Sequence, residues 1–340
     1  MRLALKRSLW LLLLITVLVT FGYTADEFTN TRKDVRMCFG AFPKGPGPDS
    51  GAVATVETVT KYLNILWKDG VTEIRIYTCK PLKNSKETIA SIAKKIGFKV
   101  AAGCWIDGNL ENNKKELGWL KDVIKKDQTN LIIVSSEAIY WKGIKADKLI
   151  EYIKEIKAVA GKIPVSIDDT PDALLANPEL VAELDKYVMV NPYAFWARAD
   201  AKDAFKKFLE IYNSLKTKYP DKIFIVGEVG WPTAGSPKGD AVPNLPNALK
   251  HLKAINEWRI KNNVIVYWFV AVDEDWKEKN EGDFASHWGL WDHDGVMKPG
   301  VKEILFKWTI VKPKVTKPEV AKPKVTTPEV TKPEVVKPKE

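Results

Sequence analysis

The feature that most constrains the fold of this chain is a regular alternation of short apolar runs with helical segments. Eight such runs recur over about 275 residues, and they are apolar throughout, as expected of strands buried on both faces. The pattern predicts a single-domain α/β fold, a (β/α)8 TIM barrel, better than an open doubly wound sheet. The strands are expected at residues 35–42, 73–77, 98–105, 130–135, 163–168, 187–190, 223–226 and 264–270. The helices are expected at residues 56–68, 86–96, 112–126, 145–160, 178–184, 201–219, 246–261 and 299–308.

The two ends of the chain differ in composition from its middle. Residues 1–25 have a basic start and an apolar run, which predicts a signal peptide, with an uncleaved membrane anchor as the alternative. Residues 26–310 are assigned to the barrel domain. Residues 311–340 form a tail with a proline at every fifth position, and its eight lysines and four glutamates supply +4 of the +10 net charge. We expect a secreted or cell-surface protein whose disordered tail is either a solvated spacer or a contact to cell wall or another anionic surface.

The expected strand ends lack the signatures of metal and nucleotide chemistry. No histidine stands at any of them, and neither G-x-G-x-x-G after the first strand nor G-K-[ST] occurs. We therefore expect no metal ion and no cofactor, with a carboxylate-only magnesium site as the alternative. We also expect no nucleic-acid partner and a monomer. The three cysteines exclude a complete set of intramolecular disulfides, so buried free thiols are expected, with one disulfide as the alternative.

Two expected strands end in a carboxylate. Strand 130–135 runs into Ser136 and Glu137, and strand 223–226 runs into Gly227 and Glu228. In a (β/α)8 barrel, reactive side chains stand at the carboxyl ends of the strands. A pair of carboxylates there is what cleavage of a glycosidic bond requires. Further candidates at other strand ends, of which the aromatic ones can stack on sugar faces, are Tyr77, Trp105, Asn191, Tyr193 and Trp231. Trp231 is expected either as such a platform or as a packing residue.

These strand ends together resemble glycoside hydrolase family 17, the β-1,3-glucanases of plants, fungi and bacteria. The resemblance spans roughly residues 35–308. The similar segments are Arg75-Ile76-Tyr77, Ser135-Ser136-Glu137-Ala138, Asn191-Pro192-Tyr193-Ala194-Phe195, Gly227-Glu228-Val229-Gly230-Trp231-Pro232-Thr233, Asp273-Glu274-Asp275-Trp276-Lys277 and His287-Trp288-Gly289-Leu290.

The resemblance implies a retaining endo-β-1,3-glucanase with Glu137 as general acid and base and Glu228 as nucleophile. It also implies a charged network beside the acid, made of Glu274, Lys277 and Glu281. A less solvated pocket for Glu137, and donors such as Tyr77 or Tyr193 near Glu228, would separate the pKa values of the two carboxyl groups.

One position departs from the family pattern. Where the family has Asn before the acid, this chain has Ser136, which is shorter and needs a water to reach the sugar 2-hydroxyl that the Asn contacts. This puts the turnover rate and the substrate in doubt. The expected partner is a β-glucan, and two alternative functions share it. These alternatives are a β-1,3-glucan transglycosylase that uses the same two carboxylates and a non-catalytic glucan-binding wall protein.

Overall fold

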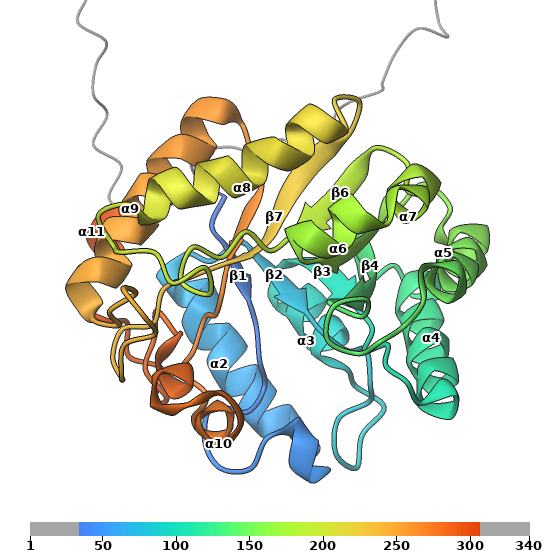
Figure 1. Ribbon diagram of the computed structural model, residues 1–340. Helices are drawn as coiled ribbons and strands as arrows, with labels where there is room; N and C mark the ends of the chain where they lie inside the picture. The colour runs from blue at the N-terminus through green and yellow to red at the C-terminus, as the bar shows by residue number, and fades with distance from the viewer. Residues whose placement is uncertain (1–33, 307–340) are drawn as a thin grey trace, which may run out of the picture. The chain divides into compact units, whose positions relative to one another are not determined.

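Residues 34–306, which the computed structural model describes, form a closed barrel of eight parallel strands (Figure 1). Each strand pairs with the next in sequence, and β8 returns to β1 through Met37 and Trp268. The (β/α)8 fold expected from the sequence is confirmed, whereas the expected segments 1–25 and 311–340 lie outside the described residues. The strands are β1 Arg36–Cys38, β2 Glu73–Ile76, β3 Lys99–Gly103, β4 Leu131–Ser136, β5 Val165–Asp169, β6 Tyr187–Val190, β7 Ile223–Val229 and β8 Val266–Trp268.

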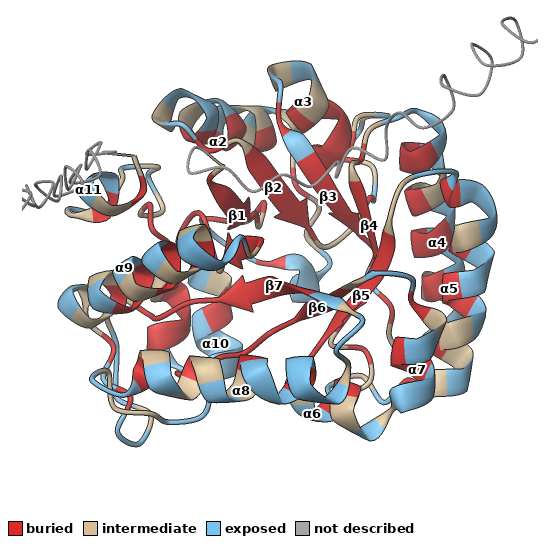
Figure 2. Cartoon of the chain, turned by 90° about the horizontal axis from the view of Figure 1, so that it is seen from above, coloured by how far each residue is buried: buried red, intermediate tan, exposed pale blue. Residues whose placement is uncertain are grey.

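The helices surround the strands, with buried faces toward the barrel and exposed faces outward (Figure 2). The α-helices are α2 Val56–Asp69, α3 Ile89–Ile96, α4 Leu110–Lys125, α5 Ala146–Ala160, α6 Pro171–Ala176, α7 Pro178–Glu183, α8 Ala204–Lys218, α9 Leu245–Asn262, α10 Glu278–Glu281 and α11 Val301–Leu305. The described residues also include three short 3-10 helices, η1 Pro48–Ser50, η2 Asp275–Lys277 and η3 Asp283–His287. None of the helices within residues 34–306 has the length and apolar character needed to cross a bilayer.

Several expected boundaries need correction. The helix expected from residue 86 begins at Ile89, because Thr88 and Ser91 bond each other's backbone N–H groups and cap the helix there. Helix α6, which directly precedes the expected helix at residues 178–184, was not predicted. The first and eighth strands are shorter than expected, and the seventh runs past residue 226 to Val229.

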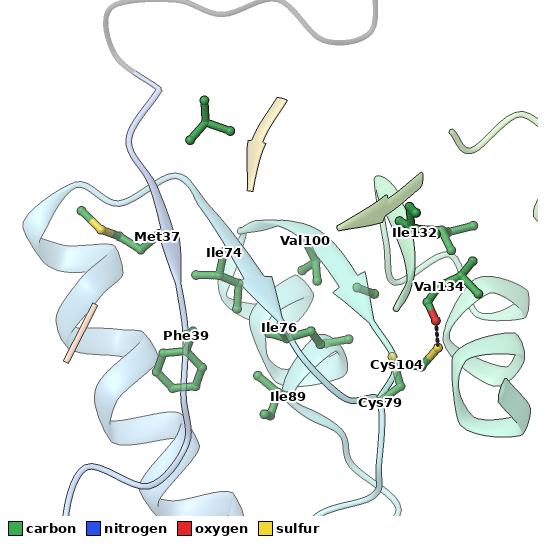
Figure 3. Close-up of a cluster of buried hydrophobic side chains, with 14 of the residues drawn as sticks. Met37, Phe39, Ile74, Ile76, Cys79, Ile89, Val100, Cys104, Ile132 and Val134 are labelled. Atoms are coloured by element: carbon green, nitrogen blue, oxygen red, sulfur yellow. Dashed lines mark hydrogen bonds between the residues drawn. The ribbon is translucent and has the colours of Figure 1, made fainter. Parts of the chain in front are cut away.

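Alternate residues of each strand face two separate hydrophobic layers. On β4, Ile132 and Val134 lie in the layer between strands and helices, part of which Figure 3 shows. Leu131 and Ile133 lie in the other cluster, inside the barrel. This period of two is the strand period, and burial on both faces explains why the sequence reads as an unbroken apolar run.

A break in this alternation turns Glu228 toward the barrel mouth. On β7, Phe224 and Val226 face the helices, so strict alternation would also point residue 228 outward. The pairing of β7 with β8 shifts register between Val226 and Val229, and Val229 instead takes the helix-facing position. Such an irregularity re-aims a side chain. A similar shift between Ile133 and Ser136 lies just before Glu137 on β4.

Candidate active site

A buried arginine connects four strands at the mouth of the barrel. Arg75, on β2, donates from Nη1 to Glu228 Oε1 at 2.7 Å and from Nη2 to Ser136 Oγ at 2.9 Å. Its guanidinium also forms an ion pair with Asp168 at the end of β5. Sequence reasoning used Arg75 only as part of a motif. An arginine inside a strand that is buried on both faces was the signal for this role, because a buried cation requires carboxylate partners.

Glu228 is surrounded by hydrogen-bond donors. Tyr77 donates its hydroxyl to Oε1 at 2.9 Å, and Tyr193 donates its hydroxyl to Oε2 at 2.9 Å. With Arg75, the carboxylate therefore accepts three side-chain hydrogen bonds, one of them from a cation. Such donors suit a carboxylate anion. The expectation that Tyr77 and Tyr193 act as donors near Glu228 is confirmed.

Gly227, the residue before Glu228, allows the Asp168 carboxylate to pack against the strand. A Cβ at position 227 would overlap Asp168 and would lie 3.0 Å from Asn191 Oδ1. Burial raises the pKa of Asp168 well above its usual value, and the Arg75 guanidinium opposes this shift. The glycine is therefore required by close approach of side chains from β5 and β6.

Glu137 lies in a different environment. Its backbone N–H donates to Asp168 O at 2.7 Å, and its φ of 49° is in the left-handed region that few non-glycine residues adopt. Its Oε1 accepts a hydrogen bond of 2.8 Å from Asn191 Nδ2. Burial and, to a lesser degree, the negative charge of Glu228 raise the pKa of Glu137 to about 7, although the Asn191 hydrogen bond acts to lower it. A carboxyl with this pKa can both give and take a proton near neutral pH.

The aromatic candidates divide between exposed and buried positions. Trp105 is 40% exposed beyond the end of β3. Trp231 is fully buried, its Nε1 donates to Val242 O at 3.0 Å, and its ring packs edge-on against Phe195. Of the two roles expected for Trp231, the structure therefore supports packing. The role of sugar platform is wrong, because the ring is fully buried. Asn191 is also buried, and it contacts Glu137.

The expected charged network forms in part, and its place differs from expectation. Lys277 Nζ lies 3.1 Å from Glu274 Oε2, and both residues are buried. Glu281, in α10, is exposed, and its electrostatic partners include Lys277 and Glu228. These residues follow β8, which neighbours β7 and stands across the barrel from β4. The network is thus on the side of Glu228 and not beside Glu137.

Cys38, Cys79 and Cys104 are buried free thiols, as the sequence predicts. Within residues 34–306, no group of three or more histidine, cysteine or acidic side chains is arranged to hold a metal ion.

A (β/α)8 barrel with two carboxyl groups of contrasting environment at its mouth defines a class of protein, the barrel glycoside hydrolases. Within that class, the family model of the BtgE/BtgC glycoside hydrolase domain matches residues 42–289. The chain belongs to glycoside hydrolase family 17, as its strand-end motifs imply.

Relatives and solved structures that the chain resembles are consistent with this family. A glucan 1,3-β-glucosidase of Candida albicans is 30% identical over 284 residues, which cover 76% of this chain and 90% of that protein. The glucan endo-1,3-β-glucosidase btgC of Emericella nidulans is 27% identical over 231 residues, which cover 60% of this chain and 36% of that protein. The fold is similar to that of a family 17 β-1,3-glucanosyltransferase from Rhizomucor miehei, with a TM-score of 0.69 and 23% identity over 80% of this chain and 97% of that one.

Proposed function

We propose that this protein is a retaining endo-β-1,3-glucanase in which Glu228 is the nucleophile and Glu137 is the general acid and base. The observation that carries the proposal is the contrast between the two carboxyl groups. Glu228 accepts hydrogen bonds from Arg75, Tyr77 and Tyr193, whereas Glu137 is largely desolvated and has a pKa raised to about 7. The substrate class follows from the relatives, which are named as glucan 1,3-β-glucosidases.

The reaction proceeds in two displacements. Glu228 attacks the anomeric carbon while Glu137 gives its proton to the departing glycosidic oxygen, which leaves a covalent glycosyl–enzyme. Glu137, now a carboxylate, then removes a proton from water as that water attacks the same carbon and frees Glu228. Retaining enzymes keep the two carboxyl groups about 5–5.5 Å apart for this purpose.

The surrounding residues bind and orient the sugar. Tyr77 and Tyr193 hold the nucleophile by their hydroxyls, and Trp105 is an exposed surface on which a sugar ring stacks. Ser136 accepts a hydrogen bond from Arg75, which leaves its own hydroxyl hydrogen to be donated, and we propose that a water carries this contact to the substrate. Asn191 keeps Glu137 in place.

Replacement of the nucleophile tests the proposal. Glu228→Ala is expected to abolish cleavage of laminarin, and added azide is expected to restore turnover with an α-glycosyl azide as product. Glu111→Ala, at the exposed start of α4, is the matched control and should keep full activity. Undiminished turnover of Glu228→Ala would refute the assignment.

One feature supports glucan transfer as a second candidate function. Tyr140 and Trp141 are 53% and 71% exposed and lie in the loop that follows Glu137, and Trp141 N donates to Glu137 O at 3.0 Å. The leaving group departs beside the acid, and an incoming acceptor takes the same place. Exposed aromatic rings there favour a second glucan chain over water. Products longer than the laminari-oligosaccharide supplied would demonstrate transfer, and only shorter products would exclude it.

We also propose that the protein acts outside the cytoplasm as a monomer, on the sequence of residues 1–25 and the family's polymeric substrate. The basic tail would contact the cell wall or another anionic surface. A non-catalytic glucan-binding role is the less favoured alternative, because both carboxyl groups are present in contrasting settings. A wild-type protein that binds laminarin without cleaving it would establish that alternative.

A further inference from the structure

The loop that leaves β4 after Glu137 is anchored at several points. Asp169 Oδ2, at the end of β5, accepts a hydrogen bond of 3.0 Å from Ile139 N. Lys142 reaches back along the loop and donates from Nζ to Ser136 O at 2.6 Å. The segment that contains Glu137 is thereby closed upon itself, with the lysine side chain joining its two ends.

The same ammonium group contacts an aromatic ring just beyond the end of the neighbouring strand β3. Lys142 Nζ lies 3.3 Å from the centroid of the Trp105 ring, which places the cation directly over one ring face. A cation over a tryptophan face is attracted by the ring's negative quadrupole. Since Trp105 is 40% exposed, part of the ring remains open to solvent.

Four carboxyl groups interact electrostatically with Lys142. They belong to Glu137 in the same loop, Asp107 beyond β3, Asp169 on β5 and Glu228 on β7. Burial lowers the pKa of Lys142 to about 8, and these carboxylates oppose that shift. The side chain is therefore largely an ammonium ion at pH 7 and retains all three donors.

We propose that Lys142 is a positioning residue that sets the distance between the sugar platform Trp105 and the chain segment that presents Glu137. One cation contacts the Trp105 ring and the carbonyl of Ser136, which directly precedes Glu137. The backbone of Glu137 has a positive φ, a conformation that neighbouring contacts must maintain. Lys142 thus aligns the glycosidic oxygen of a sugar stacked on Trp105 with the proton of Glu137. This inference rests on the proposed function.

A substrate that needs no acid separates this role from a general structural one. Lys142→Met removes the ammonium and keeps the length of the side chain. We expect it to lower kcat on laminari-oligosaccharides about 10- to 100-fold. General acid catalysis contributes about 10²–10⁴-fold to the rate, and the variant misaligns the acid without removing it. On dinitrophenyl β-laminaribioside, whose leaving group departs without protonation, the pre-steady-state release of dinitrophenol should change less than about threefold. Lys142→Arg, which keeps the charge, should recover part of the loss.

Lys145→Met is the matched control, because Lys145 is an exposed lysine three residues further along the chain. It should leave both activities unchanged, and circular dichroism and Tm should verify that all variants are folded. Equal losses on both substrates, or unchanged activity of Lys142→Met on both, would overturn the inference while the proposed function stands. A wild-type protein that cleaves neither substrate would overturn both.

Discussion

The side-chain amide of Asn191 donates a hydrogen bond of 2.8 Å to Glu137 and so links the end of β6 to the proposed acid and base. This bond lowers the pKa of Glu137, whereas burial and the charge of Glu228 raise it to about 7. Asn191 therefore limits how far the pKa of the proton donor rises.

Removal of that bond should move the pH profile of the enzyme. In Asn191→Ala the pKa of Glu137 should rise, so the alkaline limb of kcat/KM, where the acid loses its proton, should move to higher pH. Asn262→Ala, at the exposed end of α9, is the control. A limb at unchanged or lower pH, measured on laminari-oligosaccharides, would contradict the proposed role of Asn191.

The two tyrosine hydroxyls on Glu228 should each contribute to catalysis. Tyr77→Phe and Tyr193→Phe each remove one hydrogen bond to a charged group. Such a bond typically contributes about 1.5–3 kcal/mol, so each variant should lower kcat/KM roughly 10- to 150-fold. Tyr219→Phe is the control, because the Tyr219 hydroxyl donates to Leu174 O at 2.9 Å on the outer helices. Wild-type kinetics of both test variants would show that these bonds do not matter to the reaction.

The raised pKa of Glu137 should reduce stability at high pH. Its pKa is 4.5 ordinarily and about 7 in the folded protein. Between these values the native state holds more protons than the unfolded chain, so the free energy of unfolding falls as pH rises through this window. Glu137→Gln cannot ionise and should match the wild type near pH 4 but exceed its stability by about 1–3 kcal/mol near pH 8.

Urea unfolding of the two proteins at several pH values measures this difference. The comparison isolates Glu137, because the other buried carboxyl groups are common to both proteins. A stability difference that does not grow between pH 4 and pH 8 would mean that the carboxyl group has no raised pKa.

Gly227 should not tolerate a side chain. A Cβ there would overlap the Asp168 carboxylate, so Gly227→Ala should lower the free energy of unfolding by about 1–3 kcal/mol and displace Glu228. Gly108→Ala is the control, since no atom lies within 4 Å of its Cβ position and its φ is not in the left-handed region. Chemical denaturation and laminarin hydrolysis measure both effects. Equal stability of the two variants would rule out the close packing of Asp168 on β7.

Local pattern was sufficient to locate the eight strands, most of the longer helices and both proposed catalytic residues. Strands buried on both faces read as unbroken apolar runs, and a carboxylate directly after such a run lies at the carboxyl end of a barrel strand. Glu137 and Glu228 could therefore be recognised from their neighbours in the chain. Helix boundaries were less predictable. The start of α3, for example, depends on the reciprocal hydrogen bonds of the N-cap residue Thr88.

Lys142 and Arg75 could not be recognised in the same way. Lys142 lies in a loop with nothing in its neighbours to distinguish it from the exposed Lys145, and its contacts with Trp105 and Ser136 exist only after β3 and β4 pair. The burial of Trp231 and the position of the Glu274–Lys277 pair across from β4 are likewise results of how the barrel closes.

The sequence by itself determined the barrel, the order of its strands and the two carboxylates at the ends of β4 and β7. The family resemblance implied that Glu137 is the acid, and the tertiary structure alone supplied the physical distinction between the two carboxyl groups. That distinction depends on burial, on the guanidinium of Arg75 and on two tyrosine hydroxyls, all of which reach the site from other strands. The pKa of a side chain depends on the charges and donors around it in space, and the order of residues along one strand does not contain them.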